Sequence, residues 1–327
     1  MPQPLVRDDA WYAHRLAPRS GTLRVVIDTD AANEIDDPFA IAWALRRPER
    51  LRVEALYATP YSFAHRRAQM AVQQHPQFDP PGVGMERSHA AILEVFDKLG
   101  LDAAGCVHRG STRYLAALDA PERSAATDHL IATAMAMPGD EPLYVVAIGC
   151  ATNVANALLL EPRIAERIVV VWTSGYPSHA PQVNDSFNLE QDLLASQWLL
   201  DSGVPHVYLP GFHVGAQLRL SLPEMERWVR GRGAIGEHLF HLYTHNPLWP
   251  LLGITSFEAH SWVIWDLICI AWLLDPDWVP SSLVRTPRLG ADRRWSADGA
   301  RHPMREAHAV QRDAIFRAFF DSLPAMT

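Results

Sequence analysis

The sequence predicts an α/β fold with an open, mainly parallel sheet and helices on both of its faces. Short apolar runs of strand length alternate with helical patterns along most of the chain, which is typical of β-α-β units joined by right-handed crossovers. Acidic residues also follow the first apolar run directly, at the end of a strand where open α/β sheets bind ligands. Although 327 residues can hold two domains, folds of this class are often single, and we expect one domain over 1–327.

The first part of the chain supplies the first strands and helices. In order, the expected elements are a strand at 23–27, a helix at 38–47, a strand at 51–58 and a helix at 88–99. Pro38 suits the first turn of a helix, because its missing N–H group is not needed there. Residues 1–20 carry charges throughout and are interpreted as an N-terminal extension. The stretch 73–84 is rich in proline and glycine, so we expect a surface loop near the rim of the sheet, a candidate mobile lid.

A second series of elements completes the predicted sheet. In order, these are a strand at 143–148, a helix at 153–160, a strand at 168–172, a helix at 191–201 and a strand at 205–209. Gly203 ends the last of these helices. The chain then has a helical and aromatic character over 222–254. Two further helices are expected at 267–274 and 311–323, the first of them with Asp266 in the position of an N-cap.

Four aspartates lie close together directly after the first strand, at Asp28, Asp30, Asp36 and Asp37. Side chains alternate along a strand, so Asp28 and Asp30 point to one side, while the other two lie at the start of the helix. Like charges this close repel, and the group needs a hard cation, a shared proton or open water. A local alternative makes Asp37 the N-cap of the helix and Asp36 a solvated turn residue. It does not account for Asp28 and Asp30, because strands are depleted in aspartate.

The composition excludes several kinds of partner. Lys and Arg total 29 against 37 for Asp and Glu, a net charge of −8, so we expect no nucleic-acid or membrane partner and a small-molecule substrate instead. The three cysteines are sparse and odd in number, which favours a reducing compartment over a disulfide framework. No stretch approaches the roughly 18 apolar residues of a membrane span, and no apolar signal sequence is present at the start. We therefore expect a cytoplasmic protein.

Three motifs, in this order along the chain, resemble those of the inosine-uridine-preferring nucleoside hydrolases. They are the aspartate segment 28–37, the turn Gly149-Cys150-Ala151-Thr152-Asn153 and the run Phe187-Asn188-Leu189-Glu190-Gln191-Asp192, with an aspartate at a helix start, Asp266, later in the chain. The resemblance extends over most of 23–280. It implies the nucleoside hydrolase fold, Ca²⁺-dependent hydrolysis of the N-glycosidic bond of a ribonucleoside to ribose and free base, and a homo-oligomer, either a dimer or a tetramer.

The resemblance also implies a set of Ca²⁺ ligands. Asp30, Asp37 and Asp266 would bind the ion through their carboxylates and Ile148 through its backbone carbonyl, which are the oxygen donors that Ca²⁺ prefers. Asp30 would in addition be the catalytic general base, taking a proton from the attacking water. Asp28 would support Asp30 from behind. The oxocarbenium-like transition state of such a reaction favours nearby negative charge.

Contacts to the ribose follow from the same resemblance. Asp36 would accept a hydrogen bond from the 2′-hydroxyl, and Asn188 would contact the 3′-hydroxyl. The alternative for Asn188 is a turn or cap residue before a helix. Thr152 and Asn153 are expected to be structural and to cap the helix that follows the strand.

The chain departs from the family pattern in its aspartate segment and at the 5′ end of the sugar. The link between Asp30 and Asp36 has five residues, Ala31 to Ile35, where the family motif has three, and it brings Glu34 to the rim. Ser186 replaces a glutamate that grips the 5′-hydroxyl. Loss of that carboxylate favours a 5′-modified or 5′-phosphorylated substrate. His179, Asn184 and Asp185 are weaker candidates in the same loop.

The third departure concerns the base. Trp265 stands where pyrimidine-tolerant members have a histidine, which favours a purine or other flat aromatic base stacked on the indole. The alternative for Trp265 is core packing, which we expect for Trp262. His260 is a weak candidate for the acid that protonates the leaving group, and the alternative is a structural histidine. Tyr61 is a weak candidate for a contact to base or sugar.

The sequence is also compatible with two other functions. An Asp-x-Asp after a strand also occurs in haloacid-dehalogenase-like phosphatases, although the Asp36–Asp37 pair and the turn 149–153 are not explained in that class. The second alternative is a non-catalytic, Ca²⁺-dependent nucleoside- or ribose-binding protein, which the altered 5′ pocket suggests.

Overall fold

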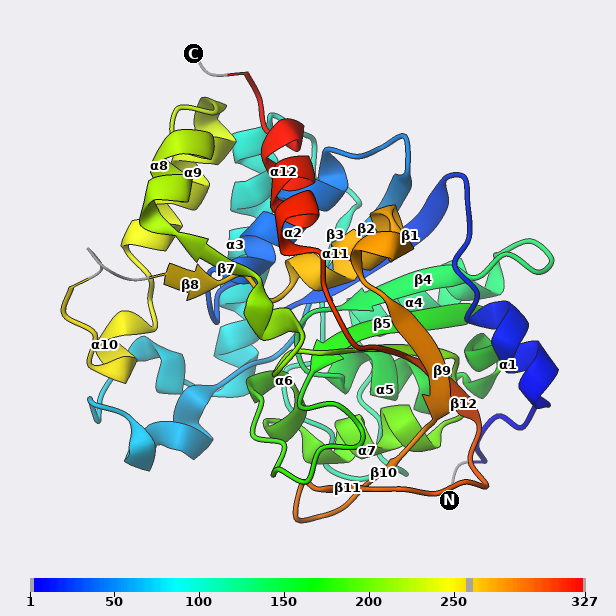
Figure 1. Cartoon of the computed structure of the whole chain (residues 1–327). Helices are drawn as coiled ribbons and strands as arrows, with labels where there is room; N and C mark the ends of the chain where they lie inside the picture. The colour runs from blue at the N-terminus through cyan, green and yellow to red at the C-terminus, as the bar shows by residue number, and fades with distance from the viewer. Residues whose placement is uncertain (1–2, 257–260, 326–327) are drawn as a thin grey trace.

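A sheet of eight strands runs through the centre of the molecule (Figure 1). The structure is a computed structural model that describes residues 3–256 and 261–325. In spatial order the strands are β3 (Val107–Arg109), β2 (Leu51–Ala58), β1 (Leu23–Thr29), β4 (Leu143–Ala147), β5 (Ile168–Ser174), β6 (His206–Pro210), β12 (Pro303–Ala307) and β9 (Ser281–Arg285). All neighbours pair in parallel except β9, which runs antiparallel to β12. The predicted open, mainly parallel sheet is confirmed.

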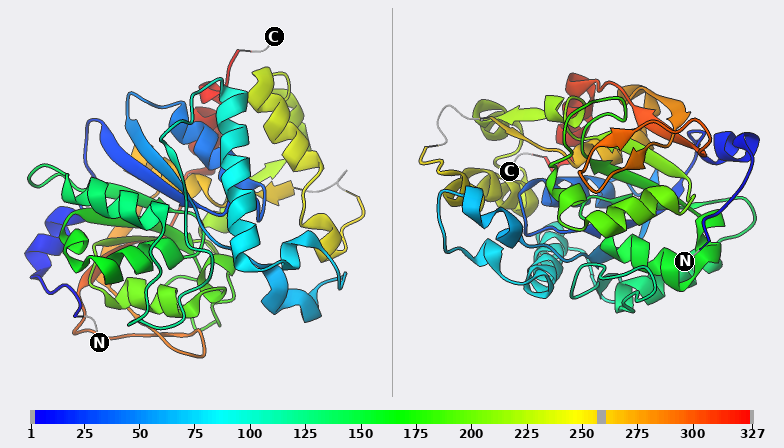
Figure 2. Two further views of the ribbon diagram at one scale, coloured as in Figure 1. Left: turned by 180° about the vertical axis from the view of Figure 1, so that it is seen from behind. Right: turned by 90° about the horizontal axis from the view of Figure 1, so that it is seen from below.

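Helices cover both faces of this sheet, because alternate residues of its strands face opposite ways (Figures 1 and 2). In β1, Val25 and Ile27 belong to the core of one face and Val26 to the core of the other. The first core is covered by α2 (Asp36–Leu45), α3 (Pro81–Leu99), α11 (Leu267–Leu274) and α12 (Arg312–Ser322). The second is covered by α4 (Ala125–Met135), α5 (Thr152–Leu160) and α7 (Leu193–Asp201).

The remaining elements surround these two layers. They are α1 (Asp9–Arg15), α6 (Phe187–Glu190), α8 (Leu222–Trp228), α9 (Gly233–Thr244), α10 (Trp249–Leu252), the antiparallel pair β7 (Arg219–Ser221) and β8 (Ser261–Val263), and the hairpin β10 (Arg288–Leu289) and β11 (Trp295–Ser296). Of these, α8 and α9 add buried side chains to the first core. Helix α9 packs beside α3, as Figure 2 shows from behind. Within the described residues, no helix has both the length and the apolar composition needed to cross a bilayer.

The starts of several helices differ from those expected from the sequence. Helix α2 begins at Asp36 rather than Pro38, and α3 begins at Pro81 rather than Ser88. The expected loop 73–84 is therefore helical in part, with a 3₁₀ turn η2 (Pro76–Phe78) before α3. Another 3₁₀ segment, η1 (Phe63–Gln69), follows β2.

The order of the strands determines where a ligand site can form. From β1 the chain passes outward to β2 and β3, and then returns to β4 on the other side of β1. The connections that leave β1 and β4 therefore diverge, and a crevice opens at the carboxyl ends of these two strands. The aspartate segment follows β1 at this point, and Ile148 follows β4.

Candidate active site

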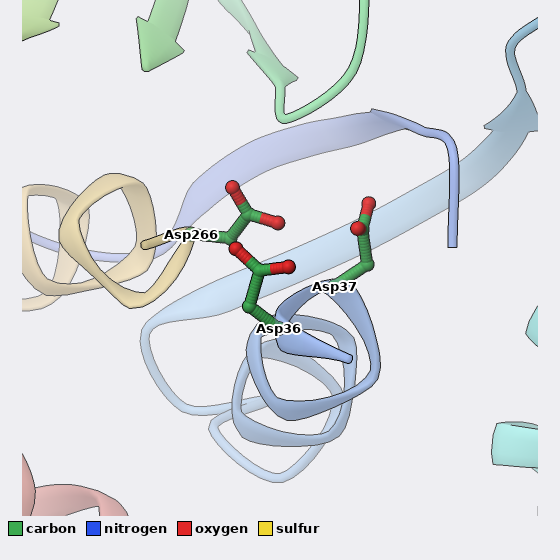
Figure 3. A group of neighbouring side chains, drawn as sticks. All are labelled: Asp36, Asp37 and Asp266. Carbon is green, nitrogen blue, oxygen red and sulfur yellow. The ribbon is translucent and has the colours of Figure 1, made fainter. Parts of the chain in front are cut away.

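Three buried carboxylates converge at the carboxyl edge of the sheet. Asp36 and Asp37 come from the first turn of α2, and Asp266 directly precedes α11 (Figure 3). One carboxylate oxygen from each lies within 4.8 Å of those of the other two. The three residues are at most 4% exposed. This spacing suits a cation held between them, because a hard divalent ion binds oxygen ligands at 2.3–2.6 Å in the case of Ca²⁺.

None of these carboxylates caps its own helix. The N-cap of α2 is Ile35, so the local reading of Asp37 as an N-cap is wrong. Asp266 does occupy the N-cap position of α11, but its side chain makes no capping hydrogen bond. The hydroxyl of Thr29 donates to Asp37. All three carboxylates are thus directed to the site rather than to helix ends.

Burial of like charges changes the acidity of this group. Burial raises the pKa of Asp36 to about 7, and a hydrogen bond from the side chain of Asp266 acts in the opposite direction. Burial and then the charges of neighbouring carboxylates raise the pKa values of Asp37 and Asp266 well above the ordinary range. A divalent cation would offset this repulsion.

Asp28 and Asp30 lie below the cluster and are fully buried. The amide of Asn153 donates to Asp28 Oδ1 at 2.8 Å, while burial raises the Asp28 pKa to about 8. Gln191 donates to Asp30 Oδ2 at 3.3 Å, and Oδ1 of Asp30 has no partner in the described residues. Burial likewise raises the pKa of Asp30 to about 7. Asp30 therefore retains one unpaired acceptor.

The glycine turn after β4 is explained by these buried aspartates. A Cβ atom on Gly149 would lie 3.1 Å from Cγ of Asp30 and 2.4 Å from a methyl of Thr59, so no larger residue fits. The expectation that Thr152 and Asn153 cap α5 is wrong, since its N-cap is Ala151 without a side-chain bond. Asn153 instead binds Asp28 and accepts from the Ser111 N–H, because a buried carboxylate needs donors.

A pocket opens above the carboxylates and contains most of the predicted site. Its lining includes Asp36, Asp37, Asp266, Ile148, Asn188, Ser186 and Trp265. Asp30 is fully buried and is not among the lining residues. Asn188 donates through Nδ2 to the carbonyl oxygens of Ile148, at 2.9 Å, and Thr173, at 3.4 Å. The alternative of Asn188 as a cap before a helix is wrong, because it lies within α6.

The long link after Asp30 is held by the segment that we expected to be a lid. Gln77 donates to the carbonyls of Ala32, at 2.8 Å, and Asn33, at 2.9 Å, and Tyr61 donates to Ala32 at 2.9 Å. Tyr61 is 1% exposed and does not line the pocket, so the expected contact to base or sugar is wrong. Its role is to support the link.

The link brings Glu34 to the pocket, as its length suggested. The indole N–H of Trp262 donates to the Glu34 carboxylate, so Trp262 is a partner of the pocket wall as well as a core residue. Burial and then the charge of Asp36 raise the pKa of Glu34 well above its ordinary value. Glu34 therefore adds to the acidity of this end of the pocket.

The other end of the pocket is aromatic and hydroxylic. Trp265 packs edge-on against Phe212 with ring centroids 5.9 Å apart, and both line the pocket. Trp265 is only half-buried, so its exposed face is available to a ligand, contrary to the alternative of core packing. Ser186 shares a 2.6 Å hydrogen bond with Ser174 and accepts from the Gly175 N–H at 2.8 Å.

The structure adds two residues to the site that the sequence did not indicate. Arg66, from η1, lines the pocket, and Gln191 contacts Asp30. Gln191 belongs to the motif 187–192, and this position could have indicated it as a site residue. No sequence pattern indicates Arg66. Of the weaker candidates, Asp185 lines the pocket, Asn184 is buried and His179 is exposed away from it. His260 lies outside the described residues.

Comparisons with known proteins give a family match and several structures of similar fold. The family model for inosine-uridine preferring nucleoside hydrolases matches residues 25–310. A plant nucleoside hydrolase superposes with a TM-score of 0.70 at 19% identity, over 93% of this chain and 99% of that one. A purine-preferring ribonucleoside hydrolase from Gardnerella vaginalis gives 0.69 at 20%, over 91% and 97%. An inosine-uridine preferring nucleoside hydrolase from Bacillus anthracis gives 0.62 at 16%, over 92% and 99%. No curated protein sequence gives a significant match.

Proposed function

The chain belongs to the inosine-uridine preferring nucleoside hydrolase family, whose members are N-glycosidases, and from this premise we propose that it hydrolyses a ribonucleoside with the help of Ca²⁺. The substrate would carry a purine or another flat aromatic base, and the products would be the free base and the sugar. The observation that carries the proposal is the convergence of Asp36, Asp37 and Asp266 in one pocket at the carboxyl edge of the sheet.

The donor set of the pocket fits a hard divalent cation. Three buried carboxylates lie close together without a cationic side chain bonded to any of them, and Oδ1 of Asp30 is a buried acceptor without a partner in the described residues. The carbonyl of Ile148 adds a neutral oxygen on the same wall. Asp37 and Asp266 from this cluster, together with Asp30 and the carbonyl of Ile148, would hold the ion, with Asp36 beside it in the same cluster. The bound ion would orient the ribose diol and make a water molecule more acidic.

Asp30 is the proposed general base. Its Oδ1 is a buried acceptor without a partner in the described residues, so it is free to take a proton. Burial raises the pKa of ion-free Asp30 to about 7, and a bound cation would lower that pKa and keep the carboxylate ionised. Gln191 fixes one oxygen of this carboxylate and leaves the other to accept the proton of the attacking water. Asp28, held by Asn153, supports Asp30 from behind.

Ribose and base would be bound by the remaining pocket residues. Asp36 is proposed to accept from the 2′-hydroxyl and Asn188 to contact the 3′-hydroxyl, since both line the pocket beside the cluster. Trp265, supported by Phe212, would stack on the base, and stacking on an aromatic ring is worth about 1–3 kcal/mol. Ser186 places a hydroxyl where the family resemblance leads us to expect a glutamate, which supports a 5′-modified substrate.

Turnover assays test this proposal directly. The protein is incubated with purine and pyrimidine ribonucleosides, with and without their 5′-phosphates, in Ca²⁺ or in EGTA, and release of base and reducing sugar is measured. We expect base release that depends on Ca²⁺ and is faster for purines. Intact substrate after long incubation in Ca²⁺, together with tight binding, would instead support the non-catalytic binding protein.

Three further expectations concern the phosphatase alternative, the oligomeric state and the location. The family match gives no support to the haloacid-dehalogenase-like phosphatase, and that alternative is abandoned. A dimer or tetramer is proposed on the family resemblance alone, and sedimentation velocity measures it. A cytoplasmic location also stays a prediction.

A further inference from the structure

Two arginines from distant parts of the chain meet beside the aromatic and hydroxylic end of the pocket. Arg66 lies in η1 and Arg293 in the turn between β10 and β11, and both donate to the carboxylate of Glu190. His65 lies 3.0 Å from the same carboxylate through Nε2. The side chain of Glu190 is 7% exposed, whereas those of Arg66 and Arg293 are 22% and 36% exposed. One buried carboxylate thus holds two guanidinium groups that remain open to solvent.

Two arginines share one carboxylate. Both donate to Glu190, and the exposed Asp185, the other acidic residue beside them, contacts Arg66 through its backbone carbonyl rather than through its carboxylate. Arg66 donates through Nε and Nη2, and its Nη1 has no hydrogen-bond partner among the described residues. A guanidinium with unused N–H groups at a cavity wall is suited to bind phosphate oxygens in pairs.

Both arginines are fixed before any ligand arrives. The guanidinium of Arg66 lies over the ring of Phe187, 5.3 Å from its centroid. Arg293 has a φ of 62°, uncommon for a residue other than glycine, and its carbonyl accepts from Asn184 through the backbone N–H at 2.8 Å and the side-chain amide at 3.0 Å. Binding a ligand would therefore require little further ordering of these side chains.

A second cavity connects the arginine pair to the pocket of the carboxylates. It is lined by Arg66, Arg293 and Glu190 and shares Arg66, Asp185 and Phe212 with the first pocket. Arg66 binds the backbone next to Ser186, the residue that marks the 5′ end of the ribose in the proposed function. A sugar with its diol at the aspartates and its 5′ carbon at Ser186 would direct a 5′ substituent to the arginine pair.

We propose that Arg66 and Arg293, held by Glu190, recognise a phosphoryl group on the 5′ carbon of the ribose, so that the substrates are nucleoside 5′-phosphates rather than free nucleosides. This inference rests on the proposed function for the position of the sugar. It extends that function, because the bond that is hydrolysed remains the N-glycosidic bond and the phosphate serves only for recognition.

The test compares a purine nucleoside with its 5′-monophosphate in the wild type and in Arg66→Gln and Arg293→Gln. We expect kcat/KM to be at least about tenfold higher for the 5′-monophosphate, and each variant to reduce this ratio about 10- to 100-fold, the range for loss of a charged hydrogen bond. Arg293→Lys, which keeps the charge, should retain part of the ratio. The matched controls are Arg67→Gln and Arg294→Gln, which neighbour the pair in sequence but line neither cavity.

Binding measurements separate this inference from the proposed function. If neither substrate is hydrolysed, the proposed function fails, and calorimetric titration with the nucleoside, its 5′-monophosphate and inorganic phosphate still tests the arginine pair. Tighter binding of the 5′-monophosphate that is lost in Arg293→Gln supports the inference. Equal affinity or equal turnover for nucleoside and 5′-monophosphate, or equal losses in the control variants, would overturn it. Thermal melting of each variant shows whether it is folded.

Discussion

The side-chain amide of Asn188 donates a hydrogen bond to the backbone carbonyl oxygen of Ile148 over 2.9 Å. This contact joins α6 to the end of β4, and it links a proposed ribose contact to a proposed cation ligand. A carbonyl oxygen has two lone pairs, so Ile148 can accept from Asn188 and still face a cation. Because Nδ2 of Asn188 is directed at Ile148 and Thr173, its amide oxygen is directed away from these two carbonyls.

Replacing Asn188 therefore tests both roles. Asn188→Asp should lower kcat/KM more than Asn188→Ala, because a carboxylate cannot donate to Ile148 and would be repelled by its carbonyl. We expect losses of about fivefold for Ala, in line with a net hydrogen-bond contribution of about 1 kcal/mol, and larger losses for Asp. Steady-state kinetics measures the loss of the ribose contact, and Ca²⁺ titration measures the effect on the cation ligand Ile148. Equal activities of the two variants would contradict the hydrogen-bond argument.

Replacing the proposed base should separate activity from stability. In Asp30→Asn the proton acceptor is lost at nearly constant volume, and kcat should fall by about 10²- to 10⁴-fold. The melting temperature without Ca²⁺ should stay the same or rise, since a buried carboxylate beside other carboxylates is removed. Asp128→Asn, on an exposed position of α4, is the control. Near-full activity of Asp30→Asn would refute its role as base.

Calcium should stabilise the protein, and more so at higher pH. A cation that binds only the folded state at 100 times its Kd adds about 2.7 kcal/mol to the free energy of unfolding. Burial raises the pKa of the proposed ligand Asp30 to about 7, above its value of 3.8 in an unfolded chain. The ion-free protein therefore loses stability as the pH rises from about 4 to above 7, and the cation reverses this loss because its ligands must be deprotonated. Melting curves from pH 5 to 8, with Ca²⁺ or EGTA, measure the increase in melting temperature that Ca²⁺ causes. Asp37→Asn should abolish this increase.

A buried histidine should make the fold sensitive to acid. His206 is 1% exposed, neither ring nitrogen has a partner in the described residues, and burial lowers its pKa to about 3. The unfolded chain binds this proton near pH 6.5 and the folded chain only near pH 3, so stability falls as the pH drops from about 6.5 to 3. Burial also lowers the pKa of His302, to about 4.

The measurement for this effect is urea unfolding at a series of pH values. His206→Phe should flatten the dependence of the unfolding free energy on pH between about 6 and 4, relative to the wild type. His179→Phe, at an exposed position, is the matched control. The same slope in all three proteins would show that His206 does not govern acid sensitivity.

The strands of the central sheet were predictable because they are buried on both faces and appear as continuous apolar runs. Strands β3, β9 and β12 were not predicted, and β3 has only three residues, none of them fully buried. The burial pattern of β9 is mostly exposed, and β12 mixes Arg305 and Glu306 with apolar residues. Helix α4 was also missed, although Ser124 and Thr127 form a capping box, because the box has threonine in place of the usual acidic residue.

The acidic half of the site was predictable and the cationic half was not. Asp36 and Asp37 are adjacent in sequence and follow a strand, so local rules place them at the sheet edge. Arg66 and Arg293 lie 124 and 103 residues from Glu190, and no local pattern brings them together. The role of Asn153 was misassigned for a similar reason, since its partner Asp28 is 125 residues away.

Gln77 donates hydrogen bonds to the backbone carbonyls of Ala32 and Asn33, so a change in one of these two segments requires a change in the other. A deletion that shortened the link by the two residues in which it exceeds the family motif would leave the buried Gln77 amide without its acceptors. Substitutions at position 77 and length changes in 31–35 should therefore be inherited together, and relatives with the short link should lack a glutamine that serves this purpose. Insertion of two residues into a short-link relative would need the supporting turn at 76–78 to be transplanted with it.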